Sequence, residues 1–233
     1  MSALKSNELR ALIDKPHRRE KKCGEYIPLI WDKLLLGYRS IKLIETIPEY
    51  RGHLGDCDYV IIAMLSDGSR ECTKAFFWEL KAPQCNIFDV DPSNENRLRP
   101  SQDLIDAENQ LLYYYHEHKH APEFIKRHNL GGSINVHLGG IIIGSNNRKI
   151  KGKTKREDKE GLYDEALDVR HLIYDALSMR FMTWDEIYNI LRAQEAPPIE
   201  VPPEIFIEEV TPSITKTSGK MIISIEEPKK ESL

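Results

Sequence analysis

Two acidic residues and a lysine lie where two neighbouring apolar segments begin and end, a placement that suits metal chemistry. Asp58 lies near the start of the first segment, and Glu79 and Lys81 close the second. Carboxylate oxygens suit Mg²⁺ or Mn²⁺, and a bound cation lowers the pKa of a water that can attack phosphorus. A lysine beside the cation can orient that water or stabilise the developing charge. The alternative is a surface ion pair at the end of a hairpin.

The two segments, 55–65 and 73–81, are predicted to form a β-hairpin. Both are rich in β-branched and aromatic residues, and Asp67-Gly68 between them is a turn signal. Because the strands of a hairpin run antiparallel, the start of the first lies beside the end of the second. The hairpin therefore gathers two carboxylates and an ammonium on one sheet face, where they are costly to bury unpaired.

The length of the turn decides which acidic residue lies beside Glu79. One loop pairs Ser66 with Glu71, and the same count sets Asp58 opposite Glu79. A tighter turn sets Asp56 opposite Glu79 instead. Either register places an acidic residue beside Glu79, and the lysine two residues further on points to the same face.

The strongest predicted helix covers residues 101–129. Ser101 can cap it, and a buried stripe is predicted at Leu104, Ala107, Leu111 and Tyr115. Gln110 and Tyr114 are four residues apart and share a helix face. Beside the carboxylates, the Gln110 amide could hydrogen-bond a metal-bound water or a phosphate oxygen, with the Tyr114 hydroxyl supporting it. The alternative is an ordinary contact between helix and sheet.

In their order along the chain, these motifs resemble those of the PD-(D/E)XK nuclease superfamily. Asp58-Tyr59, the turn, and the run from Glu79 to Pro83 resemble its central motif, although Cys57 replaces the usual proline. Gln110 to Tyr114 resembles the QxxxY helix of the RecB-like branch. The run from Gly139 to Gly144 and the late segment 182–187 (Met-Thr-Trp-Asp-Glu-Ile) resemble parts of Shedu-type antiphage nucleases. The resemblance covers roughly residues 20–195.

The resemblance implies an α/β fold with a restriction-endonuclease-like core, a central mixed sheet of four to five strands flanked by helices. It implies metal-dependent hydrolysis of phosphodiester bonds in DNA, with Asp58 and Glu79 holding Mg²⁺ or Mn²⁺. Lys81 would orient or activate the attacking water, and Gln110 would position water or phosphate. A glutamate of the first helix often joins such a site; Glu25 and Glu20 are the candidates, and Glu25 is the predicted one. The implied biology is antiphage defence by a homo-oligomer.

Basic residues in two polar segments are the predicted DNA contacts. The segment 82–100 is predicted to be a loop, and the segment 145–159 is the most basic of the chain. The predicted phosphate contacts are Arg97 and Arg99 in the first segment, and Arg148, Lys149, Lys151, Lys153 and Lys155 in the second. The alternative is that both segments are solvated loops.

Composition limits the classes of protein to consider. Of 233 residues, 30% are charged and 40% hydrophobic, which indicates a globular chain. The formal net charge is −4, so nucleic-acid binding requires a local basic patch. No apolar run is long enough for a membrane span, and no signal-peptide pattern opens the chain. Four cysteines without metal or disulfide spacing favour a cytoplasmic location.

Three regions are predicted along the chain: a basic lead-in (1–24), a nuclease-like domain (25–195), and a Pro-rich linker with a strand-forming C-terminal arm (196–233). Within the domain we predict further helices and strands at 26–36, 40–48, 135–144, 162–179, 180–182 and 183–194. Two other functions stay open. The fold could serve as a nucleic-acid-binding module with an idle metal site, or as an assembly protein whose arm builds an oligomer.

Overall fold

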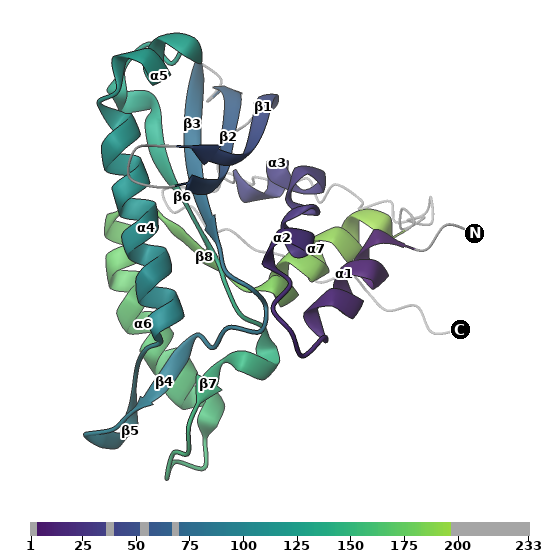
Figure 1. Cartoon of the computed structure of the whole chain (residues 1–233), viewed down its shortest axis with the longest axis vertical. Helices are drawn as coiled ribbons and strands as arrows, with labels where there is room; N and C mark the ends of the chain where they lie inside the picture. Colours follow the sequence, from purple (N-terminus) through teal and green to yellow (C-terminus); the bar gives the residue numbers. More distant parts are fainter. Residues whose placement is uncertain (1–3, 36–39, 52–55, 67–69, 197–233) are drawn as a thin grey trace, which may run out of the picture. The chain divides into compact units, whose positions relative to one another are not determined.

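The computed structural model describes residues 4–35, 40–51, 56–66 and 70–196 (Figure 1). These residues belong to one compact unit, in which helices flank a central mixed sheet. The predicted α/β class with a four- to five-stranded mixed sheet is therefore confirmed. The predicted C-terminal arm lies outside the described residues.

The central sheet has five strands in the order β1-β2-β3-β6-β8. These are β1 (Ser40–Arg51), β2 (Asp56–Ser66), β3 (Glu71–Leu80), β6 (Val136–Ile142) and β8 (Arg180–Met182). The first three pair antiparallel, and β3, β6 and β8 pair parallel. The long apolar strands β2, β3 and β6 lie in the middle, where both of their faces are covered. The short β8 forms an edge, as predicted.

The register of the central hairpin is the one that pairs Ser66 with Glu71. The ladder continues to Tyr59 and Trp78, so the next step sets Asp58 opposite Glu79. The tighter turn that would have set Asp56 there is therefore excluded.

Helices cover both faces of the sheet (Figure 1). On one face, α4 (Gln102–Lys119) and α6 (Lys159–Ala176) pack on a core that contains Val60, Ile62 and Phe77 of the hairpin. On the other, α1 (Lys5–Ile13), α2 (Glu20–Gly24) and α7 (Trp184–Glu195) pack on a second core. The N-terminal segment supplies buried side chains to this second core, which are Leu9, Ile13 and Cys23.

Asp58 and Glu79 face the side of α4. Side chains alternate along a strand, so Asp58 points the same way as Val60, and Glu79 the same way as Phe77. Both of those apolar residues belong to the core beneath α4. The helix predicted to carry Gln110 thus lies on the face to which the carboxylates point.

The prediction that residues 82–100 form a loop is wrong in part, because this segment contains two strands. β4 (Phe88–Asp91) and β5 (Asn94–Pro100) form a hairpin, and β7 (Ile150–Lys151) pairs with β4 in a second sheet of order β5-β4-β7. β5 is mostly polar and exposed, so its sequence lacks the apolar alternation of a half-buried strand. Its pairing depends on β4 and on the packing of Phe88 and Leu98 in the core beneath α4.

Two predicted helices are interrupted at prolines. The segment 26–36 forms a 3₁₀ turn, η1 (Ile27–Leu29), and a short helix, α3 (Trp31–Leu34), rather than one helix. Pro28 lies inside the turn and cannot donate a backbone hydrogen bond. The segment 101–129 likewise splits into α4 and α5 (Pro122–Arg127). Two other 3₁₀ turns, η2 (Ser133–Asn135) and η3 (Asn146–Arg148), precede β6 and β7.

Gly140 in β6 has no room for a side chain. A Cβ atom there would lie 2.3 Å from the carbonyl oxygen of Arg180 and 2.8 Å from the ring of Trp78. The added methyl group would have to displace both the backbone of β8 and the buried ring of Trp78. We therefore expect Gly140→Ala to lower the free energy of unfolding by about 1–3 kcal/mol. Urea unfolding of both proteins measures the loss. A loss below about 0.5 kcal/mol would show that β8 moves aside at little cost.

No helix among the described residues is long and apolar enough to cross a membrane.

Candidate active site

The backbone of Lys81 is fixed from two sides where β3 ends. Its N–H donates to the carbonyl oxygen of Ile142 at 2.8 Å, which extends the pairing of β3 with β6. Its carbonyl oxygen accepts from Nε1 of Trp184 at 2.7 Å. Trp184 is fully buried and begins α7, whose N-cap Thr183 forms a capping box with Glu186. The closing helix thus holds the strand end that carries Lys81.

Lys81 links the sheet to α4 through its ammonium group. Its Nζ donates to Oε1 of Glu79 at 2.6 Å and to Oε1 of Gln110 at 2.6 Å. Both side chains of the ion pair are shielded, with 15% of Lys81 and 3% of Glu79 exposed. Burial lowers the pKa of Lys81, but the charge of Glu79 and its hydrogen bond raise that pKa more, so it lies above its usual value. The ionised carboxyl of Glu79 therefore favours the charged ammonium.

Asp58 lies beside Glu79 and is held by the backbone of β3. Its Oδ2 accepts from the N–H of Leu80 at 2.8 Å. Burial raises the pKa of Asp58, and the hydrogen bond from Leu80 opposes that rise. Burial and the neighbouring charge of Asp58 raise the pKa of Glu79 to about 8, while Lys81 lowers it. Two buried carboxyl groups thus share one polar site and one ammonium.

One oxygen of Glu79 has no partner. Oε2 is buried and no described N–H or O–H group donates to it, while a proton shared between the carboxyl groups of Glu79 and Asp58 would lower the pKa of Asp58. A buried oxygen of this kind is costly unless a proton or a cation satisfies it. Because Asp58 lies beside it, the two carboxylates present oxygen ligands of the kind that Mg²⁺ and Mn²⁺ take. The residues therefore fit the predicted metal ion.

Of the two acids considered in the first helix, Glu20 lies nearer to Lys81, and both Glu20 and Glu25 line the hollow beside Asp58. Glu20 begins α2, and its pKa is raised by burial and by the charge of Asp58, while Lys81 opposes that rise. Glu25 follows α2 and is exposed, and Asp56 is exposed at the start of β2. The packing of Cys23 in the second core sets how α2 is oriented against the sheet. Residue spacing alone does not reveal that packing.

The site falls short of a full protein cage for a metal. Among the residues that the structure describes, no three His, Cys, Asp or Glu side chains are grouped closely enough to hold an ion. Mg²⁺ usually keeps several waters and is bound through only one or two carboxylates. The pair Asp58 and Glu79 meets that requirement, with Glu20 close enough to influence the same site.

Gln110 contacts Lys81 at the site, whereas Tyr114 packs in the core. Tyr114 is buried in the core beneath α4, and burial together with Glu79 raises its pKa. No described residue makes a hydrogen bond to its hydroxyl, so the expected support for Gln110 is not present. Tyr114, rather than Tyr115, belongs to the buried stripe of α4. Gln110 holds Lys81 and reaches the site as predicted.

The predicted DNA contacts gather around the small sheet β5-β4-β7. Several of them are already paired with acids: Arg97 with Asp91, Lys149 with Glu160, and Lys155 with Glu95. Such pairs cancel part of the positive charge. Among the described residues, Arg148, Lys151, Lys153 and Arg99 make no ion pair, so these four are the better candidates for phosphate contacts.

Two hollows open beside Glu20. The first, here the Lys81 hollow, has a volume of about 400 Å³ and contains Lys81 and Gln110 in its lining, together with Arg18, Glu20, Asp103, Asp106, Asn109 and Tyr113. The second has a volume of about 410 Å³ and is lined in part by Asp58, Glu20 and Leu80. Lys81 thus lines the first hollow and Asp58 the second, whereas Glu79 lines neither.

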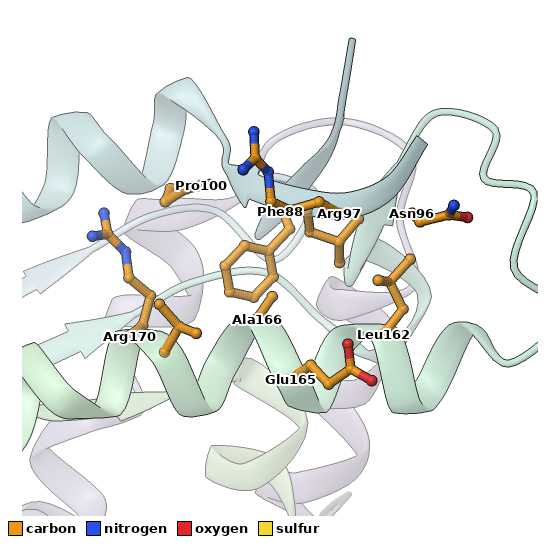
Figure 2. Close-up of a pocket in the computed structure, with 10 residues that line it drawn as sticks. Phe88, Asn96, Arg97, Pro100, Leu162, Glu165, Ala166 and Arg170 are labelled. Atoms are coloured by element: carbon orange, nitrogen blue, oxygen red, sulfur yellow. The ribbon is translucent and has the colours of Figure 1, made fainter. Parts of the chain in front are cut away.

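A third hollow is separate from this chemistry. Its volume is about 250 Å³, and it lies between the small sheet and α6, where Phe88 points toward Ala166 (Figure 2). Apolar side chains line most of it, with Arg97, Glu165 and Arg170 at its edges. None of the predicted catalytic residues reaches it.

Comparison with known proteins gives no further guide: the chain matches no protein-family model and no curated protein. Geometry therefore supports a functional proposal here. Asp58, Glu79, Lys81 and Gln110 were predicted from sequence and lie together. Of the two candidate acids, Glu20 lines both hollows, whereas Glu25 lines only the second, beside Asp58.

Proposed function

We propose that this chain is a metal-dependent nuclease that hydrolyses phosphodiester bonds in DNA. The observation that supports the proposal most is the unpartnered, buried Oε2 of Glu79 beside Asp58, within an ion pair whose ammonium also binds Gln110. Two carboxylates and a lysine where β2 begins and β3 ends, with a glutamine from α4 beside them, match the ordered motifs of the PD-(D/E)XK resemblance.

Asp58 and Glu79 would hold Mg²⁺ or Mn²⁺ in this proposal, with Glu20 as a neighbouring acid. When bound, such an ion polarises a phosphoryl oxygen and lowers the pKa of a water. Lys81 then contributes a fixed positive charge, because Glu79 and Gln110 both hold its Nζ. Its raised pKa suits charge stabilisation and water orientation rather than removal of a proton.

The site has solvent on two sides, through which DNA could reach it. Arg99, Arg148, Lys151 and Lys153 would contact phosphates from the small sheet. We further propose a role in antiphage defence and a homo-oligomeric state. The outer face of α6 exposes Val169, Leu172 and Ile173, and light scattering of the purified protein would measure the oligomeric state.

Asp58→Asn tests the proposed function directly. The asparagine keeps an oxygen that can accept from the N–H of Leu80 but removes a charged metal ligand. Plasmid and linear DNA are incubated with each protein in Mg²⁺, Mn²⁺ or EDTA. We expect cleavage by the wild type only with metal, and a loss of at least about 100-fold in the variant.

Two results would contradict the proposal. Cleavage that survives both EDTA and Asp58→Asn would place the activity elsewhere. Retention of DNA without cleavage under any of these conditions would favour the binding module with an idle metal site.

A further inference from the structure

The Lys81 hollow is larger than a reacting phosphate group requires. Its volume of about 400 Å³ is that of pockets that bind small ligands, and it is open to solvent rather than enclosed. One side is a continuous face of α4, formed by Asp103, Asp106, Asn109, Gln110 and Tyr113. Arg18 and Glu20 lie across from that face. The hollow therefore has room for a base and its sugar next to Lys81.

Tyr113 is an aromatic ring at this hollow without a structural role in the described part of the chain. Its side chain is 61% exposed, whereas the adjacent Tyr114 is 4% exposed and belongs to the core. Tyr113 makes no hydrogen bond or ring contact with any described residue. A large exposed aromatic beside a hollow is the platform on which unpaired bases stack.

The charges of the hollow favour a base over a second phosphate. Glu20, Asp103 and Asp106 would repel phosphate oxygens but can accept hydrogen bonds from the exocyclic amino groups of bases. Arg18 does not change this balance, because it is paired with Asp103 at 3.0 Å. Lys81 is the other cation of the lining and would meet the phosphate of the bound nucleotide.

We infer that the Lys81 hollow binds one unpaired nucleotide, with its base stacked on Tyr113, and that the substrate is single-stranded DNA or a single-stranded end. A base inside a duplex has both of its faces covered by its neighbours, so it must leave the stack before Tyr113 can contact it. The inference rests on the proposed function in one respect, namely that the phosphate beside Lys81 is the one that is hydrolysed. The stacking site itself does not require cleavage.

Fluorescence anisotropy with Ca²⁺ in place of Mg²⁺ tests the inference. The probes are a labelled single strand of about 15 nucleotides and a blunt-ended duplex of the same strand with its complement. We expect the wild type to bind the single strand more tightly. Tyr113→Ala should weaken single-strand binding by about 5- to 150-fold, with duplex binding changed less than about twofold.

Two matched variants separate stacking from other effects. Tyr113→Phe keeps the ring and should bind the single strand within about threefold of the wild type. Leu112→Ala removes the adjacent exposed apolar side chain of α4, which is 39% exposed and is absent from the lining, and should change nothing. Thermal unfolding of all variants confirms that they fold.

The inference and the proposed function fail in different ways. Equal or tighter duplex binding, an unaffected Tyr113→Ala, or no DNA binding at all would overturn the inference. Metal-dependent cleavage that requires Asp58 but not Tyr113 would support the proposed nuclease function and contradict the stacking site. Single-strand binding that requires Tyr113, without any DNA cleavage, would support the stacking site and contradict the proposed nuclease function.

Discussion

Glu79→Gln is expected to make the metal-free protein more stable at pH 8, although it removes a predicted catalytic residue. In the folded protein the pKa of Glu79 is raised to about 8 by burial and by Asp58. An unfolded glutamate titrates near 4.3. Between these values the folded state binds the proton more tightly, so the stability of the wild type falls as pH rises from about 4 to 8. Glutamine has no such penalty. Its NH₂ can donate to Asp58, and its amide oxygen can still accept from the ammonium of Lys81, which keeps a partner.

The size of this effect follows from linkage. A shift of this extent sets an upper bound of roughly 5 kcal/mol, and we expect Glu79→Gln to gain on the order of 3 kcal/mol at pH 8 in EDTA. At pH 4.5 the two proteins should differ by less than about 1 kcal/mol. Urea unfolding across this pH range measures both quantities. Mg²⁺ should stabilise the wild type at pH 8 and leave the variant unchanged.

Glu71→Gln provides the matched control, because Glu71 is an exposed acid at the other end of the same strand. It should leave the pH dependence of stability as it is. If Glu79→Gln were less stable than the wild type at pH 8 without metal, the carboxyl group would be satisfied by its surroundings. The argument for a cation at Oε2 would then be lost.

The carboxylate pair could be predicted because it depends on local rules. Two apolar segments around Asp67-Gly68 specify a hairpin, and the pairing of Ser66 with Glu71 fixes the partner of Glu79 by counting. Gln110 could be placed because a capped, amphipathic helix shows its buried face through its spacing. The alternation of side chains along a strand and their repeat along a helix can each be read from a few residues around the site. These local patterns are sufficient to place the carboxylates and Gln110.

The remaining features depend on contacts between distant segments. β5 is polar and becomes a strand only through pairing with β4, which no local period reveals. Glu20 reaches the site because Cys23 packs in the core, and spacing could not separate it from Glu25. Lys149 pairs with Glu160, which lies 11 residues further along the chain, and Lys155 pairs with Glu95 of β5. Runs of basic residues therefore overstate the charge available to DNA.

Lys81→Met is expected to have the largest effect on cleavage. Methionine nearly keeps the length of the side chain and removes the ammonium, which Glu79 and Gln110 hold in place. Fixed charges and general acid–base groups at such sites usually contribute about 10²- to 10⁴-fold to the rate. We expect a loss in that range, measured under single-turnover conditions with saturating Mg²⁺ so that weaker metal binding does not contribute. Lys42→Met, an exposed lysine on β1, is the matched control and should cleave normally.

Gln110→Leu then separates the charge from its orientation. Without the amide, Lys81 keeps its hydrogen bond to Glu79 but loses the one to α4, so the ammonium stays near the site with more freedom. The loss of rate should be smaller, about 10- to 100-fold, because misplacement costs less than removal of the charge. A double variant should be no slower than Lys81→Met alone, since Gln110 acts through the lysine. An additive loss would show instead that Gln110 contacts the water or the phosphate itself, the role that its position on the helix first indicated.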